Sequence, residues 1–248
     1  ATTEIYTLSL HDALPISDSL KSVMRNYQKT GFRWLKSLSR YGFGGILADD
    51  MGLGKSLQMI ALLKSEKESR AAQSGEAKPS IIVCPTTLVL NWVNEFNKFA
   101  PDMRVLPVLG KLAERQEKAV YAQDYDVVIT SYELLRRDDD LYANMTFDYA
   151  VIDEAQYIKN PDTKNAKSVK KLASAHRFAL TGTPVENSLA ELWSIFDFIM
   201  PRYLFSYGKF KERFETEIVS GNVSAAEKLG KLVSPFILRR LKSEVLTE

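Results

Sequence analysis

Residues 44–58 read GGILADDMGLGKSLQ. The short apolar run Ile46–Ala48 predicts a buried strand, and Leu57–Leu63 predicts the helix that follows it. Between them, Gly52 and Gly54 allow a tight turn, because glycine adopts positive φ angles without a Cβ clash. A strand, a tight turn and a helix N-terminus gather several backbone N–H groups around one point. That arrangement favours an anion such as phosphate.

The two residues after this turn fit the same chemistry. Lys55 would bring positive charge to the β and γ phosphates of a nucleotide, and Ser56 would offer a hydroxyl to Mg²⁺. The strict phosphate-loop pattern begins with glycine where this chain has Asp49. The motif by itself therefore also fits a glycine-rich turn with a solvent-exposed lysine.

A second motif follows another predicted strand. Phe147–Ile152 is apolar, and Asp153 and Glu154 come directly after it. An aspartate there can hold Mg²⁺, directly or through water, and the neighbouring glutamate can orient or deprotonate an attacking water. The alternative is an acidic N-terminus of the next helix. Because both motifs follow predicted strands, together they predict a nucleotide-binding site.

The rest of the chain alternates between short apolar runs and helical periodicity. The spacing of strands and helices predicts an α/β fold with a mostly parallel sheet covered by helices on both faces. In such a sheet the ligand lies at the carboxyl ends of the strands. After Asn187 the pattern is helical throughout. The further predicted strands are Ile81–Cys84, Val105–Leu109, Val127–Thr130 and Phe178–Leu180.

The composition excludes several classes of protein. The chain has 248 residues, 45% of them hydrophobic and 26% charged, which is ordinary for a globular protein. A single cysteine, Cys84, excludes an internal disulfide, and no Cys/His cluster suggests zinc. No apolar run approaches the roughly 20 residues of a membrane helix, so we expect no membrane partner. The net charge of +2 is too small to indicate nucleic acid by itself.

The first residues do not fit this pattern. Residues 1–17 read ATTEIYTLSLHDALPIS, which resembles the translation of a common sequencing-library adapter. A secretory signal would need early basic residues and an unbroken apolar core, and this stretch has neither. We therefore expect a non-native arm and leave it out of the fold prediction.

Seven longer stretches of the chain are distinctive: MRNYQKTGFRWL (24–35), GGILADDMGLGKSLQ (44–58), IIVCPTTLVLNWVNEFNKF (81–99), VVITSYELLRRD (127–138), VIDEAQYIKN (151–160), ALTGTPVENSLAELWSIFDFIMP (179–201) and SPFILRRLKSEV (234–245). Together they resemble the Swi/Snf-type ATPases of helicase superfamily two, and specifically their first RecA-like lobe. The resemblance covers residues 20–246. In that family Asp49 is the usual residue, whereas Asp50 replaces a glutamate and Ser56 a threonine.

The resemblance implies a role for each matching position. Lys55, Asp153 and Glu154 would be catalytic, and Ser56 and Asp153 would hold Mg²⁺. Gln28 would read the adenine of ATP, although a glutamine on an amphipathic helix is often only solvated. The remaining nucleotide contacts would come from the loop itself: Asp50, Gly52, Leu53, Gly54, Lys55 and Ser56.

Two further groups of residues would contact DNA or couple the DNA site to the nucleotide site. Thr86 and Thr87, and Thr130 and Ser131, would contact the backbone of one strand, because short hydroxyls at strand ends suit phosphate oxygens. Their alternative role is helix capping. Thr181, Gly182 and Thr183 would couple the nucleotide site to the DNA site through Gln156. Trp92, Trp193 and Phe196 lie on helical faces, so we expect them in the core.

The resemblance also implies an organisation for the chain. Residues 18–187 would form the ATP-binding lobe, 188–233 a helical protrusion, and 234–248 the start of a linker to a second RecA-like lobe. The whole protein would be a DNA-dependent ATPase that translocates on double-stranded DNA, with a possible nucleoprotein or polymerase partner. Without the second lobe, which supplies arginines to the γ-phosphate, we expect this part to hydrolyse ATP very slowly. Arg239 and Arg240 lie in the linker, so we do not expect them to be those arginines.

Other functions are weighed against this one. A GTPase should carry Asn-Lys-x-Asp for guanine, and the chain has no such tetrapeptide. Another kind of P-loop enzyme, such as a kinase, and a catalytically silent DNA-binding or scaffold fragment are the remaining alternatives. The intact Lys55, Asp153 and Glu154 argue against the silent fragment. The DEAQ form of residues 153–156 resembles bacterial members, so we expect a cytoplasmic, nucleoid-associated protein.

Overall fold

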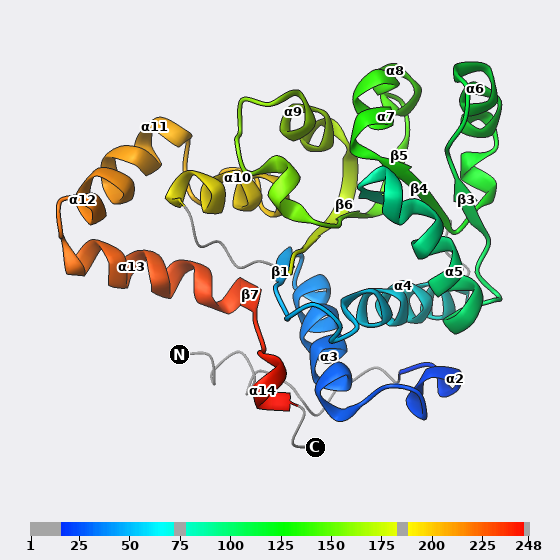
Figure 1. Cartoon of the computed structure of the whole chain (residues 1–248), viewed down its shortest axis with the longest axis horizontal. Coiled ribbons are helices and arrows are strands. Elements are labelled where there is room, and N and C mark those ends of the chain that lie inside the picture. The colour runs from blue at the N-terminus through cyan, green and yellow to red at the C-terminus, as the bar shows by residue number, and fades with distance from the viewer. Residues whose placement is uncertain (1–15, 72–77, 183–187, 246–248) are drawn as a thin grey trace.

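The computed structural model describes residues 16–71, 78–182 and 188–245. Its centre is a seven-stranded sheet in the order β3-β4-β2-β5-β6-β1-β7, in which neighbouring strands all pair in parallel (Figure 1). This is the predicted α/β fold. The strands are β1 (Gly45–Leu47), β2 (Ser80–Cys84), β3 (Val105–Pro107), β4 (Val127–Ser131), β5 (Thr146–Ile152), β6 (Ala173–Leu180) and β7 (Ile237–Leu238).

Helices cover both faces of the sheet. Strands β1, β2 and β4 are buried along their whole length, with no polar alternation, because each is covered on both sides. One group of helices lies below the sheet in Figure 1: α3 (Asn26–Arg40), α4 (Lys55–Ala71) and α5 (Val89–Phe99). The other lies above it: α7 (Tyr132–Arg137), α9 (Lys164–Lys171) and α10 (Leu189–Ile199).

Shorter elements complete the sheet connections. The remaining helices outside the C-terminal part are α2 (Asp18–Lys21), α6 (Leu112–Val120) and α8 (Asp139–Tyr142). Single 3₁₀ turns are η2 (Thr86–Leu88), η3 (Ala122–Asp124), η4 (Ala155–Ile158) and η6 (Ser234–Phe236).

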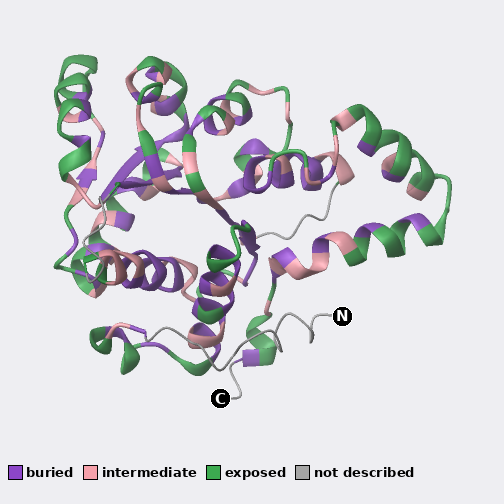
Figure 2. Cartoon of the chain, turned by 180° about the vertical axis from the view of Figure 1, so that it is seen from behind, coloured by how far each residue is buried: buried purple, intermediate pink, exposed green. Residues whose placement is uncertain are grey.

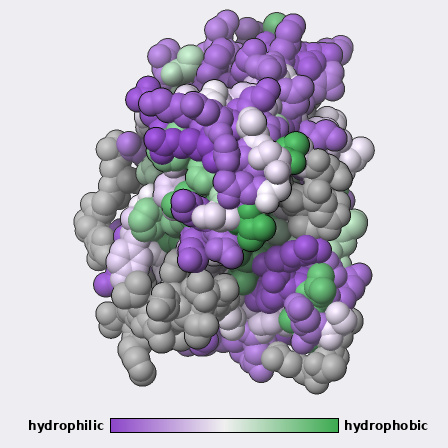
Figure 3. All heavy atoms as spheres, turned by 90° about the vertical axis from the view of Figure 1, so that its left-hand side faces the viewer, coloured by the Kyte–Doolittle hydropathy of each residue, from purple (hydrophilic) through white to green (hydrophobic). Residues whose placement is uncertain are grey.

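A helical arm extends from one end of the sheet, where helices were predicted after Asn187. It consists of α11 (Tyr207–Phe210), the π-helical turn η5 (Lys211–Glu215), α12 (Thr216–Val219) and α13 (Val223–Val233). The arm stands clear of the sheet in Figure 1, and the face on its side of the molecule is mostly hydrophilic in Figure 3. It buries only a narrow apolar stripe that includes Phe210, Phe214 and Leu229.

After the arm the chain returns to the sheet. Strand β7 pairs in parallel with β1, with Ile46 opposite Ile237 and Leu47 opposite Leu238. The sequence pattern does not predict this strand, because two apolar residues are too few to show a period. The sheet therefore takes its edge strand from beyond the helical arm, within the stretch expected to begin a linker. The last described helix, α14 (Lys242–Val245), follows it.

Three predicted elements differ clearly in extent. The helix predicted over Leu57–Leu63 is α4, which runs from Lys55 to Ala71. The strand predicted over Phe178–Leu180 is β6, which begins at Ala173, and the strand predicted over Val105–Leu109 is β3, which ends at Pro107. Of the expected non-native arm, residues 1–15 lie outside the described part of the chain, and Ile16 is buried in the core.

The core is one large apolar cluster on both sides of the sheet (Figure 2). Trp92, Trp193 and Phe196 belong to it, as predicted. Among the described residues, no helix is long and apolar enough to cross a membrane.

The strand register determines where the functional residues meet. Ile152 at the end of β5 lies opposite Val83 of β2 and Ala179 of β6, and Leu180 lies opposite Leu47 of β1. The carboxyl ends of these four strands therefore share one edge. The segments after β1, β5 and β6 carry the glycine turn, Asp153 and Thr181, so these come together there.

A core substitution should destabilise this sheet strongly. Ile82 lies in the middle of β2 and is fully buried, so Ile82→Ala should lower the free energy of unfolding by about 2–5 kcal/mol. Val120, which is 75% exposed, provides the control, and Val120→Ala should change it by less than about 0.5 kcal/mol. Urea denaturation followed by circular dichroism measures both. Equal effects of the two substitutions would contradict the buried position of β2.

Candidate functional site

The turn between β1 and α4 has the geometry of a phosphate-binding loop. Gly52 and Gly54 have φ angles of 84° and 74°, a conformation that suits glycine. A Cβ on Gly54 would lie 2.4 Å from Nε2 of Gln28, so this position has no room for a side chain. The backbone therefore turns sharply, and α4 begins at Lys55.

The Lys55 ammonium lies over this loop. Its Nζ donates to the carbonyl oxygens of Asp49, at 2.7 Å, and Asp50, at 3.4 Å. Burial lowers the pKa of Lys55, against the carboxylates of Asp153 and Asp49, which favour its charged form. The lysine is thus a partly desolvated cation beside carboxylates.

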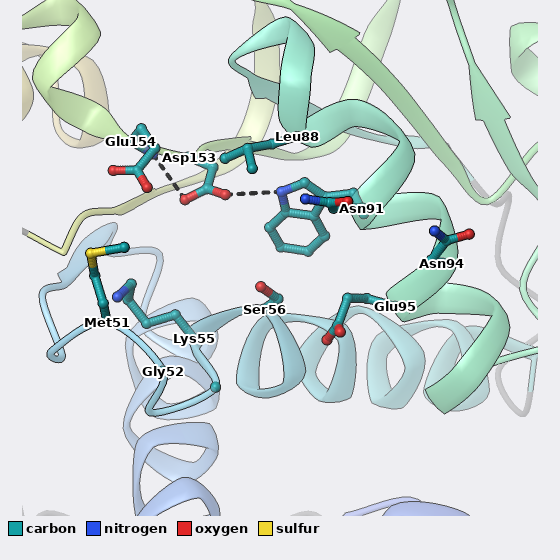
Figure 4. A pocket seen from close by; sticks show the side chains of 12 residues that line it. Met51, Gly52, Lys55, Ser56, Leu88, Asn91, Asn94, Glu95, Asp153 and Glu154 are labelled. Atoms are coloured by element: carbon teal, nitrogen blue, oxygen red, sulfur yellow. Dashed lines mark hydrogen bonds between the residues drawn. The ribbon is translucent and has the colours of Figure 1, made fainter. Parts of the chain in front are cut away.

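A cavity of about 450 Å³ opens beside the lysine (Figure 4). The loop and the start of α4 line one side, including Lys55 and Ser56, and Asp153 and Glu154 line another. Asn91 and Glu95 of α5 complete the wall. The two predicted motifs therefore lie in one cavity.

Asp153 is held at the end of β5 by neutral donors. The indole Nε1 of Trp92 donates to Oδ2 at 2.9 Å, and the backbone N–H of Glu154 donates to Oδ1 at 2.9 Å. Tyr132 donates its hydroxyl to the backbone oxygen of Asp153 at 2.8 Å. Burial raises the pKa of Asp153, and the two hydrogen bonds to its carboxyl group oppose that rise.

Glu154 and Gln156 form a short chain of contacts with β6. Glu154 has a left-handed backbone, with φ of 53° and ψ of 58°, which costs a non-glycine residue about 1 kcal/mol. The amide Nε2 of Gln156 donates to Oε2 of Glu154 at 2.8 Å. Thr181, just after β6, donates its hydroxyl to Oε1 of Gln156 at 3.3 Å. The three side chains connect the end of β6 to the cavity.

The other predicted nucleotide contacts lie along the same loop. Gln28 is buried against it: Nε2 donates to the Leu53 carbonyl at 3.1 Å, and Oε1 accepts from the Arg25 N–H at 2.9 Å. Leu53 is buried with Tyr27 and Val245. Gly182 faces the loop, because a Cβ there would lie 2.9 Å from Met51. Their roles toward a nucleotide stay predictions, and Thr183 lies outside the described residues.

The four residues predicted to contact DNA fall into two pairs. Thr86 and Thr87 are exposed in η2, at the carboxyl end of β2. Thr130 and Ser131 are buried, and the Ser131 hydroxyl caps α7 by accepting from the Leu134 N–H at 3.2 Å. The Thr130 hydroxyl donates to the Val108 carbonyl at 3.5 Å, so neither side chain is presented to an outside ligand. For Ser131 the alternative role, helix capping, is the one observed.

Part of the cavity wall was not predicted from the sequence. Trp92 was expected only as a core residue, and its N–H toward Asp153 has no signal in helical periodicity. Asn91 and Glu95 share its helix, and their spacing of four places them on one face. Two polar residues four apart on this helix were the sequence signal that could have pointed to a second wall for the site of Asp153.

Comparisons with known proteins agree with the resemblance seen in the motifs. Residues 27–248 match the SNF2-related domain. The TATA-binding protein-associated factor MOT1 of Saccharomyces cerevisiae is 39% identical over 95% of this chain and 14% of its own length. The uncharacterized ATP-dependent helicase MG018 of Mycoplasma genitalium is 43% identical over 91% of this chain and 21% of its own length.

Solved structures show the same similarity. The Sulfolobus solfataricus SWI2/SNF2 ATPase core in complex with dsDNA matches with a TM-score of 0.79 and 45% identity, over 88% of this chain and 44% of that one. The SWI2/SNF2 ATPase core domain from the same organism matches with a TM-score of 0.75 and 43% identity. The chain thus spans less than half the length of each of these four proteins.

The Trp92 hydrogen bond should be visible as pH-dependent stability. Trp92→Phe removes a donor to a buried carboxylate, so the free energy of unfolding should fall by about 1.5–3 kcal/mol at about pH 7 without divalent metal. The donor favours the ionised form of Asp153. The loss should therefore be largest well above the raised pKa of Asp153 and should shrink as the pH falls through that pKa.

Trp193→Phe is the matched control. The indole of Trp193 donates to the neutral carbonyl of Phe205 at 3.2 Å, so its loss should not vary with pH in this way. Urea denaturation at several pH values measures both variants. A Trp92→Phe effect that is constant over this range would contradict a bond to an ionised Asp153.

Proposed function

Because the chain belongs to the SNF2-related domain family, we propose that it is the ATP-binding lobe of an enzyme that moves along double-stranded DNA. One observation carries this proposal. The glycine loop with Lys55 and the Asp153–Glu154 pair line the same cavity, at the carboxyl edge of a parallel sheet.

The cavity offers the donors that ATP and Mg²⁺ need. Lys55 would supply charge to the phosphates, and α4 begins at the wall of this cavity, where the first N–H groups of a helix have no partner within it. The Ser56 hydroxyl and the Asp153 carboxylate are hard oxygen ligands on opposite walls, which suit Mg²⁺. When bound, the metal would neutralise charge that develops on the phosphates. Glu154 would orient the attacking water and accept its proton.

The contacts of Gln156 support a coupling role. Its amide donates to Glu154 and accepts from Thr181, so a displacement after β6 would change the position of the Glu154 carboxylate. We propose that DNA bound at this edge of the sheet acts on hydrolysis through this side chain.

Thr86 and Thr87 are the proposed DNA contacts of this lobe. They are exposed at the same edge as the cavity, and short hydroxyls there suit phosphate oxygens rather than bases. Binding would therefore be independent of sequence. A second RecA-like lobe and a nucleoprotein or polymerase partner belong to the same proposal for the whole protein, which would act in the cytoplasm on the bacterial nucleoid.

Removal of the lysine charge should weaken nucleotide binding. Lys55→Ala should raise the Kd of a fluorescent, non-hydrolysable ATP analogue in Mg²⁺ about ten- to a hundredfold, because a charge-assisted contact is worth about 1.5–3 kcal/mol. Lys231→Ala, on the exposed face of α13, should leave the Kd unchanged. Equal affinity of Lys55→Ala and the parent chain would refute the assignment.

DNA binding should be weak and should fall with salt. Fluorescence anisotropy with two duplexes of different sequence should give equal affinities, with a log–log salt slope of about −0.9 for each phosphate that a lysine or arginine neutralises. The double variant Thr86→Ala/Thr87→Ala should bind at least about tenfold more weakly, since a hydrogen bond to a charged phosphate oxygen is worth about 1.5–3 kcal/mol. Ser69→Ala, near the far end of α4, is the control. A strong preference for one duplex would contradict backbone recognition.

A further inference from the structure

Asp49 is a carboxylate with no exposed surface. It stands at the first position of the phosphate-binding loop, where the strict pattern has glycine. A buried carboxylate without partners is strongly disfavoured, so this position needs a dedicated counter-charge.

Arg240 supplies that charge from 191 positions along the chain. Its Nε donates to Oδ1 of Asp49 at 2.9 Å, and a terminal nitrogen donates to Oδ2. The same nitrogen donates to Oε1 of Gln58 at 2.8 Å, and the other donates to the Tyr27 carbonyl. Gln58 closes the network by donating to Asp49 at 3.1 Å. The guanidinium therefore forms hydrogen bonds to three elements at once: α3, α4 and the loop.

The segment around Arg240 follows the loop closely. We define residues 238–245 as the strap. The Ala48 N–H donates to the Leu238 carbonyl at 2.7 Å, and the Asp50 N–H donates to the Arg240 carbonyl at 3.0 Å. The Lys242 N–H donates to the Asp50 carboxylate at 3.0 Å.

The strap also makes an apolar contact with the far end of the loop. Leu53, Tyr27 and Val245 form a small buried cluster apart from the main core. Contacts from the strap thus fall on Ala48, Asp49, Asp50 and Leu53. In Figure 1 the strap runs from β7, beside β1, to α14, near the start of α3.

We propose that Arg240 is a positioning residue for the phosphate-binding loop. It acts through Asp49: the planar guanidinium fixes the carboxylate in two directions at once, and the carboxylate belongs to the loop backbone. A lysine could supply the charge but not the two parallel bonds. The strap as a whole therefore determines the loop conformation in which Lys55 and the N–H groups face the cavity.

Reciprocity follows from this arrangement, and this part rests on the proposed nucleotide binding. If the strap favours the loop conformation that binds phosphate, a bound nucleotide must stabilise the strap by the same factor. The stability of the strap would then depend on whether the nucleotide site is occupied.

The test compares Arg240 with a matched ion pair elsewhere in the 248-residue chain. Arg115 is bonded to Asp138 through two nitrogens, and the side chains of that pair are 8% and 1% exposed, against 13% and 0% for Arg240 and Asp49. The variants are Arg240→Lys, Arg240→Met and Arg115→Met. Thermal unfolding shows that each is folded and how far each is destabilised.

The first readout needs no nucleotide. Amide hydrogen exchange of residues 49–57 should be at least about tenfold faster in Arg240→Met than in Arg115→Met at equal loss of thermal stability. Arg240→Lys, which keeps the charge, should show a smaller increase in the same peptide. Loop exchange that is equal in the Arg240 and Arg115 variants would overturn the proposal and leave the pair merely structural.

The second readout uses the fluorescent ATP analogue with Mg²⁺. Its Kd should rise at least about fivefold in Arg240→Lys and stay unchanged in Arg115→Met, and the analogue should slow exchange of residues 238–245 in the parent chain. An unchanged Kd in Arg240→Lys and Arg240→Met would overturn the positioning role. A parent chain that binds no analogue would overturn the proposed function, while loop exchange would still decide the role of Arg240.

Discussion

The parallel register of β5, β6 and β1 places three segments that are far apart in sequence at one edge of the sheet. Parallel strands all end on the same side, so the glycine loop, Thr181 and Asp153 must meet there once the strands pair. β6 lies between the other two strands, which explains why Thr181 reaches Gln156 and Gly182 faces the loop. The cavity is a consequence of this pairing and of the short turns that follow each strand.

Two carboxylates at this edge are buried, and they differ in the charge of the groups that donate hydrogen bonds to them. The charge of Asp49 is balanced by Arg240 within the fold, and Gln58 adds a neutral hydrogen bond. Among the described residues, the hydrogen bonds to the carboxyl group of Asp153 come from neutral donors, the Trp92 indole and the Glu154 backbone, and burial raises its pKa. The Lys55 ammonium attracts Asp153 without a hydrogen bond to it, so the carboxylate still has oxygen lone pairs for an added cation. The difference in partners separates the structural aspartate from the one that suits Mg²⁺.

The sequence predicts those parts of the lobe whose signal is local. Six strands contain a short apolar run, and the loop is a contiguous motif, so both could be found from neighbouring residues. Strand β7 and the Arg240–Asp49 pair could not, since a two-residue strand has no period and the pair joins positions 191 residues apart. Burial also decides between roles that sequence leaves open: Thr86 and Ser131 both lie at the carboxyl ends of strands, yet of these two only Thr86 is exposed. Trp92 was correctly placed in the core, but its N–H group gained a polar partner only through packing against β5.

The carboxamide of Gln156 joins Glu154 to the segment after β6. An amide group has a donor side and an acceptor side, and here the donor side meets Glu154 while the acceptor side meets Thr181. Turning the amide over would place two acceptors together at Glu154 and leave the Thr181 hydroxyl facing an NH₂ group. The orientation of Glu154 is therefore tied to the position of the segment after β6. The left-handed backbone of Glu154 strengthens this dependence, because a conformation that is costly by itself persists only while its surroundings hold it.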